Sequence, residues 1–154
     1  MIITHASNEK IEKISSRLDG PLRGCLFFGY EGNTYNLTKC NFQYNLEIDE
    51  GNTIEARRFF YEHSENEVVV LEVLEMMRTE VFASFDEMSD SDLCELLDET
   101  QGTHELDMEA AWLVQQYQGI LAHKLGYDAC ESFDEQGVVF IVYCVDRKLE
   151  EVAA

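Results

Sequence analysis

The fold of this chain is decided by the stretch from Leu125 to Val145, LGYDACESFDEQGVVFIVYCV. Its last part, from Val138 onward, is the longest apolar run in the chain and is rich in β-branched and aromatic residues, which predicts a buried strand. A helix is expected to end at Leu125-Gly126. Between the two lies a predicted loop that carries carboxylates, and Asp134 and Glu135 form its tight turn. Asp, Glu and Gly are common in ordinary hairpin turns, so this stretch alone does not show whether the two carboxylates are structural or belong to a functional site.

Strands are expected at both ends of the chain and helices mostly in the middle. This order predicts an α+β fold, one domain over residues 1–154, whose first and last strands pair or neighbour each other. The other expected strands are Met1–His5, Cys25–Phe28, Tyr35–Leu37 and Phe42–Ile48. The expected helices run from a cap at Ser7 through Leu18, over Thr53–Glu62, over Glu65–Met77, through Leu93–Leu97 after a cap at Ser89 or Asp90, and over Asp107–Leu125.

Charge is the outlying property of the composition. There are 31 acidic residues against 11 basic ones, a net charge of -20. Such a balance argues against direct nucleic-acid binding and against anionic membrane surfaces, and it permits a basic protein partner. No apolar stretch reaches the ~18 residues of a membrane span. The chain shows no basic, signal-like N-terminus, so a cytoplasmic location is expected.

Several kinds of site are disfavoured by spacing. The five cysteines contain no C-x-x-C pair, and the four histidines show no H-x-x-x-H or H-E-x-x-H pattern, so no metal site is predicted. Cys25, Cys94 and Cys144 are expected in the core, and Cys130 stands among acids that would raise the pKa of its thiol. There is also no G-x-S-x-G elbow, P-loop or dinucleotide-binding glycine motif.

The segments that remain carry a resemblance. His5-Ala6-Ser7 ends the first expected strand, and Gly24-x-x-Phe27-Phe28-Gly29 follows the next helix. Near the other end, Leu125-Gly126-Tyr127 precedes Asp134-Glu135-Gln136-Gly137 and the apolar strand. These motifs resemble mono-ADP-ribosyltransferase domains, most closely the phage-encoded type I-F anti-CRISPR ADP-ribosyltransferases. The resemblance covers the first thirty residues and the part after Asp107, and it implies a split antiparallel sheet with a cluster of helices from the middle of the chain.

The resemblance implies NAD as the co-substrate and gives roles to individual residues. Asp134 matches the family's acid, with Glu135 as the adjacent alternative, and either would stabilise the oxocarbenium-like state of glycosidic cleavage. His5 would hold a ribose hydroxyl, and Ser7 would support it or bind the carboxamide. Aromatic rings that match a nicotinamide-stacking position are Phe28, which the motif favours, Tyr30 and Tyr35.

Two positions depart from the family pattern. Ala6 stands where the family has a glycine whose backbone approaches the nicotinamide amide. Alanine offers the same N–H and C=O provided that its φ is negative. Gln136 stands where the family has a histidine, in the last motif.

Three functions are compatible with these observations. By resemblance, the first is an NAD-dependent enzyme that modifies a basic DNA-binding subunit of a CRISPR surveillance complex in the host bacterial cell. The second is a non-catalytic DNA mimic that inhibits a nucleic-acid-binding protein, for which the acidic stretch from Asp86 to Glu99 is the candidate surface. The third is a toxin of the same fold that modifies another acceptor, such as a nucleic acid, which the net charge disfavours.

Overall fold

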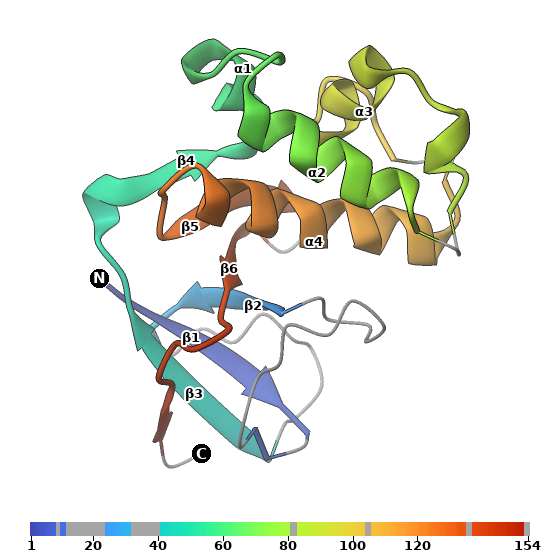
Figure 1. Cartoon of the computed structure of the whole chain (residues 1–154). Helices are drawn as coiled ribbons and strands as arrows, with labels where there is room; N and C mark the ends of the chain where they lie inside the picture. Colours follow the sequence, from blue (N-terminus) through green and yellow to red (C-terminus); the bar gives the residue numbers. More distant parts are fainter. Residues whose placement is uncertain are drawn as a thin grey trace.

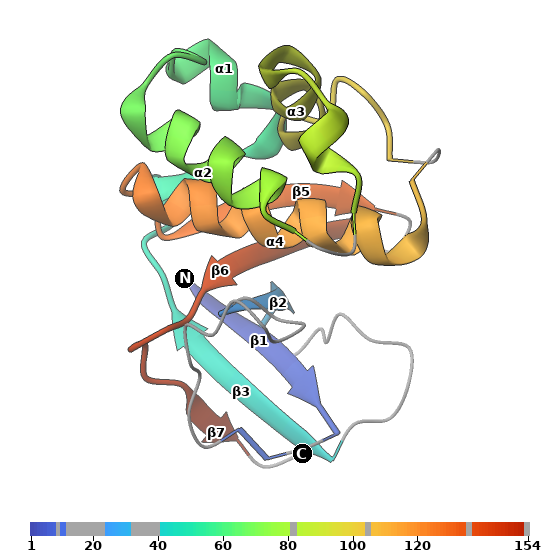
Figure 2. The same ribbon diagram turned by 45° about the vertical axis from the view of Figure 1, so that its right-hand side comes forward.

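A computed structural model describes residues 1–8, 10–11, 24–31, 41–80, 83–103, 106–134 and 137–152. Ser7, expected to cap a helix, instead lies in a strand, and residues 8, 10 and 11 are not helical. The rest of that expected helix, from residue 12 to Leu18, and the expected strand at Tyr35–Leu37 lie outside the described residues. The described chain is a mixed α+β structure, as predicted, with helices gathered on one side of part of the sheet (Figures 1 and 2).

Seven strands of the described residues form one sheet in the order β4-β5-β6-β2-β1-β3-β7. They are β1 (Ile2–Ser7), β2 (Cys25–Tyr30), β3 (Phe42–Glu47), β4 (Thr53–Glu55), β5 (Ala129–Asp134), β6 (Gly137–Tyr143) and β7 (Glu150–Val152). The β4–β5 pair is parallel and the other pairs are antiparallel.

The predicted pairing of the first and last strands is wrong. β2 separates β1 from β6, and β3 separates β1 from β7. Four of the six residues of β2 are buried, including Cys25, Leu26 and Phe28. An apolar strand of this kind is stable when other strands flank it on both edges, and this explains its place between β1 and β6.

Two segments form strands where helix or loop was expected. Thr53–Glu55 was predicted to begin a helix, but it forms β4 and pairs with Ala129–Glu131. Thr53 and Ile54 are β-branched, so strand pairing suits them better than a helical turn. The predicted carboxylate loop is likewise mostly strand, because β5 pairs with β6 as far as Asp134–Gly137.

The helices agree better with the sequence predictions. They are α1 (Phe59–Glu62), α2 (Val68–Arg78), α3 (Asp90–Leu97) and α4 (Met108–Lys124), with short 3-10 turns at Glu50–Asn52, Ala56–Arg58 and Phe85–Glu87. Ser89 caps α3 through a 3.1 Å bond from the Asp92 N–H, and Asp107 caps α4 through a 2.8 Å bond from the Ala110 N–H. Gly126 ends α4 with φ +98°, the left-handed conformation that favours glycine.

Two apolar clusters flank the sheet. The larger one joins α2, α3 and α4 to one face of β2, β5 and β6, through residues such as Cys25, Cys130 and Ile141. The smaller one lies on the other face and contains Ile3, Leu26, Phe28, Leu46 and Phe140. As predicted, Cys25, Cys94 and Cys144 are buried in these clusters. The β1–β2 junction is therefore packed from the face opposite to the helices.

Candidate active site

The sheet splits between β1 and β2. Their pairing ends at Thr4–Gly29, whereas β1 stays paired with β3 as far as Ser7–Phe42. His5 spans the beginning of this split, because its Nδ1 lies 2.7 Å from the carbonyl oxygen of Phe27. A carbonyl oxygen only accepts, so Nδ1 carries the proton and donates it. In the neutral ring this leaves Nε2 as the acceptor.

Burial lowers the pKa of His5 below its usual value, and the hydrogen bond to Phe27 opposes that change only in part. The imidazole is therefore neutral at physiological pH. A neutral ring with a fixed tautomer presents one defined acceptor atom. That is a suitable group to accept a hydrogen bond from a ligand hydroxyl.

Ala6 and Ser7 continue β1 beyond His5. Both pair with β3, opposite Gln43 and Phe42, so Ala6 has the extended conformation of a strand. Among the described residues, only Glu99 and Asp146 are non-glycine residues with positive φ. The condition for Ala6 to offer its backbone groups as glycine would is thus met.

The aromatic candidates differ in exposure. Phe28 is fully buried, and its ring centre lies 5.6 Å from that of His5, so it supports the imidazole directly. Tyr30 is 47% exposed and packs edge-on against Phe140 at 5.3 Å. The ring of Tyr30 is accordingly the accessible one of the two. Tyr35 lies outside the described residues.

Asp134 ends β5, where its backbone pairs with Gly137. β6 and β2 lie between its strand and β1, so strand pairing alone does not bring Asp134 beside His5. Its side chain and the whole of Glu135 lie outside the described part of the chain. The roles of these two acids therefore stay predictions.

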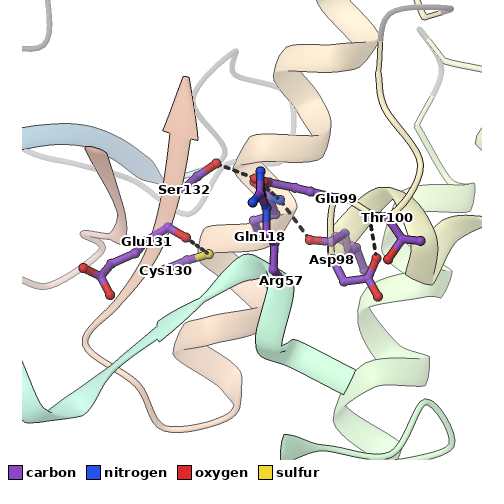
Figure 3. A network of polar contacts seen from close by, with 9 residues as sticks. Arg57, Asp98, Glu99, Thr100, Gln118, Cys130, Glu131 and Ser132 are labelled. Carbon is purple, nitrogen blue, oxygen red and sulfur yellow. Dashed lines mark hydrogen bonds and ion pairs between the residues drawn. The ribbon is translucent and has the colours of Figure 1, made fainter. Parts of the chain in front are cut away.

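A polar network that the sequence did not suggest lies between β5 and the helices (Figure 3). The Glu99 carboxylate accepts hydrogen bonds from the Ser132 hydroxyl and, at 3.3 Å, from Gln118 Nε2. Arg57 Nε approaches the same carboxylate at 3.7 Å. Glu99 has φ +63°, a conformation uncommon for a residue with a side chain, so the network holds a strained position.

This network borders a cavity of about 960 Å³. The apolar part of its wall includes Leu96, Met108, Trp112 and Phe133. Phe133 comes directly before Asp134, and Trp112 stacks at 6.4 Å on Phe27, the residue whose carbonyl holds His5. The cavity thus adjoins both predicted parts of the site from the helical side. A sequence signal was present in Gln115, Gln116 and Gln118, polar residues in the middle of a largely apolar helix.

Three acids of the stretch from Asp86 to Glu99 are engaged within the protein, and one of them, Asp98, accepts a 2.9 Å bond from the Thr100 N–H. Asp90 pairs with Arg78, and the Glu99 carboxylate bonds to Ser132 and Gln118. The pKa of the nearby Cys130 thiol is well above its usual value, chiefly because it is fully buried and secondly because of Glu99 and Glu131. This agrees with the expectation that Cys130 is no nucleophile.

A mixed sheet that splits beside a strand-end histidine, with helices covering its other half, is consistent with the ADP-ribosyltransferase-like fold. A solved structure described as "Crystal structure of an anti-CRISPR protein" shares this fold, with a TM-score of 0.61 and 23% sequence identity over 99% of this chain and 95% of that chain. The family model described as "Anti-CRISPR Type I-F ADP-ribosyltransferase AcrIF11" matches residues 28–151, and the chain belongs to that family. No curated protein matches the chain.

The family match covers Phe28, Tyr30, Tyr35, Asp134 and Glu135 and begins after His5-Ala6-Ser7. Family membership therefore rests on residues 28–151, which do not include β1. The argument for His5-Ala6-Ser7 rests on the geometry of β1. In the described part of the chain, no helix is long and apolar enough to cross a membrane.

Proposed function

We propose that this protein transfers ADP-ribose from NAD to a protein of a type I CRISPR surveillance complex and so inactivates it in the cytoplasm of the infected cell. Membership in the anti-CRISPR ADP-ribosyltransferase family supports the class of reaction. The observation that carries the proposal to particular residues is the hydrogen bond from His5 to Phe27 across the β1–β2 split.

The residues at the split suit NAD by their chemistry. Nε2 of His5 would accept a hydrogen bond from a ribose hydroxyl, and the backbone of Ala6 would bind the carboxamide. Ser7 would support either contact, and an aromatic ring, Phe28 or the more exposed Tyr30, would contact the nicotinamide. NAD supplies the activated glycosidic bond, and a carboxylate from Asp134 or Glu135 would stabilise positive charge on the ribose or orient the acceptor.

The acidic composition supports the choice of partner. With a net charge of -20, the protein is attracted to a basic surface, and electrostatic attraction of this kind raises association rates. A DNA-binding subunit presents such a surface. The acceptor is accordingly proposed to be a residue of the DNA-recognising part of that subunit.

The test is incubation of the full chain with the intact type I-F complex and isotopically labelled NAD, followed by mass spectrometry of the subunits. One adduct of ADP-ribose mass on one subunit is expected, together with loss of DNA binding. His5→Asn is the matched variant and should form the adduct ~100-fold or more slowly than wild type. Stoichiometric inhibition that needs no NAD and persists in the His5→Asn and Asp134→Asn variants would overturn the proposal and favour the DNA-mimic alternative.

A further inference from the structure

The cavity of about 960 Å³ beside Glu99 has the size of a ligand site. Its wall combines an aromatic surface, Trp112, with the polar side chains of Glu99, Gln118 and Ser132. Figure 3 shows these three polar side chains. The described candidates for NAD binding, His5, Ala6, Ser7, Phe28 and Tyr30, do not line it. The cavity is therefore a candidate site for a second ligand, separate from the nicotinamide end of NAD.

Gln118 indicates that this ligand is a hydrogen-bond donor. Its side chain is 1% exposed, and Nε2 donates to the Leu97 carbonyl at 2.9 Å and to Glu99 at 3.3 Å. These two acceptors fix which end of the amide is nitrogen. The other end, Oε1, is buried and has no partner among the described residues. A buried carbonyl oxygen without a donor is costly, and a donor group that reaches this wall would remove the cost.

Glu99 indicates that the ligand is cationic. Its side chain is only 24% exposed, and its carboxylate is fixed by Ser132 and Gln118. Glu109 adds a second negative charge to the cavity wall. Arg57 is the positively charged residue of the described part of the wall. Its side chain is 70% exposed, and its Nε lies 3.7 Å from Oε2 of Glu99. A phosphate-bearing ligand would be repelled by this arrangement, whereas a cation would be attracted.

Trp112 selects among cations. Its indole already stacks with Phe27 on one side, with ring planes 28° apart, and it also lines the cavity. A guanidinium group is flat, stacks on an indole and presents five N–H donors, whereas an ammonium group is compact and more strongly hydrated. One guanidinium can therefore contact the ring and donate to both Glu99 and Gln118.

We infer that this cavity binds an arginine side chain presented by the partner protein. The identity of that partner rests on the proposed function, and the net charge of -20 complements a basic partner surface. Arg57 acts in this arrangement as an internal competitor, because its own guanidinium already pairs with Glu99. Removal of Arg57 should consequently strengthen the binding of an external arginine.

The experiment uses Trp112, the single tryptophan of the chain, as its reporter. The full chain without NAD is titrated with N-acetyl-arginine methylamide while indole fluorescence and the Trp112 Nε1–H resonance are recorded. A saturable change is expected. The citrulline analogue, which keeps the shape but lacks the charge, should bind at least ~10-fold more weakly. AMP should leave Trp112 unchanged.

Variants assign the response to the wall residues. Glu99→Gln should weaken binding by ~10-fold or more, and Arg57→Gln should strengthen it. Glu151→Gln, on an exposed position of the edge strand β7, is the control of equal charge change and should have no effect. If Glu99→Gln does not fold, Arg57→Gln still tests the inference, because it changes an exposed side chain and should leave the fold intact.

Three results would overturn the inference: equal binding of the citrulline and arginine analogues, a Trp112 response to AMP alone, or no response to arginine up to ~50 mM. The first would remove the role of charge, and the second would assign the cavity to a nucleotide. Because NAD is absent throughout, a failure here is distinct from a failure of ADP-ribose transfer.

Discussion

Nδ1 of His5 lies 2.7 Å from the carbonyl oxygen of Phe27, across the point where β1 and β2 separate. This contact fixes the tautomer of a partly buried, neutral imidazole, and the ring of the same Phe27 stacks on Trp112 at the cavity. Phe27 therefore connects the predicted NAD-binding end of β1 with the cavity on the helical face.

Exchange of His5 for asparagine should separate structure from activity. The Asn amide nitrogen replaces Nδ1 as donor to Phe27, but nothing replaces the Nε2 acceptor. We expect ADP-ribose transfer to fall ~100-fold or more, because a positioning contact is lost. The free energy of unfolding, measured with urea, should change by less than ~1 kcal/mol. Wild-type transfer rates in His5→Asn would exclude a role for Nε2.

The lowered pKa of the partly buried His5 should also make stability depend on pH. The pKa of His5 in the folded protein lies below the ordinary value of 6.5. Between these two pKa values, His5 is protonated in the unfolded chain but neutral in the folded protein. The contribution is fully present above pH 6.5 and is lost as the pH falls from there toward the folded pKa. His123, whose pKa is also lowered, first by burial and then by Lys124, adds to the same trend. Urea unfolding between pH 7 and 5 should show a shallower decline in His5→Asn than in wild type.

Gly119 should be needed for the packing of α4 on the sheet. A Cβ there would lie 2.7 Å from Ile141 Cγ2 and 2.8 Å from Cys25 Sγ, both buried side chains. Overpacking costs ~1–3 kcal/mol, which exceeds the ~1 kcal/mol that alanine gains in a helix. Gly119→Ala should therefore lower the free energy of unfolding by up to ~2 kcal/mol, the difference between these two effects. Gly51→Ala, whose nearest contact would be an ordinary 3.4 Å, is the control and should change it little.

Much of this fold could be predicted from the sequence, because its signals are local. α3 begins at the predicted cap Ser89, and α4 begins at the predicted boundary Asp107. α2 is helical despite the run of three valines at its start, since Val70, Val73, Leu74 and Met77 bury one helical face. β4 and β5 were missed, because their pairing joins Thr53–Glu55 to Ala129–Glu131, a contact that no local pattern reveals. The order of the strands depended in the same way on long-range pairing.

The residues of the site could be predicted from the sequence only where they form a motif. His5-Ala6-Ser7 matched a strand end, and the structure adds the β1–β2 split and the tautomer of His5. Glu99, Gln118 and Ser132 come from three separate segments and meet only in the folded chain. The assignment of residues 1–154 to a single domain stays a prediction.

The bond between Ser132 and Glu99 should stabilise the strained loop after α3. Ser132 is 3% exposed, so Ser132→Ala leaves a largely buried carboxylate without one of its donors. We expect a loss of ~1–3 kcal/mol in the free energy of unfolding. In Glu99→Gly the same serine change should cost less, and a double-mutant cycle measures the coupling. A coupling near zero would show that the bond contributes nothing in solution.

The choice between Asp134 and Glu135 can be made by a pair of isosteric variants. Asp134→Asn and Glu135→Gln each remove one charge from the β5–β6 hairpin and keep its size. If Asp134 stabilises charge on the ribose, Asp134→Asn should reduce transfer by ~100-fold or more, while Glu135→Gln stays within a few-fold of wild type. Both should unfold at nearly the wild-type urea concentration, because a hairpin-end carboxylate buries little apolar surface. Labelled-NAD transfer and urea unfolding, run on the same preparations, separate lost chemistry from lost structure. The reverse ranking would assign the acid to Glu135, and full activity in both variants would exclude the hairpin as the source of the acid.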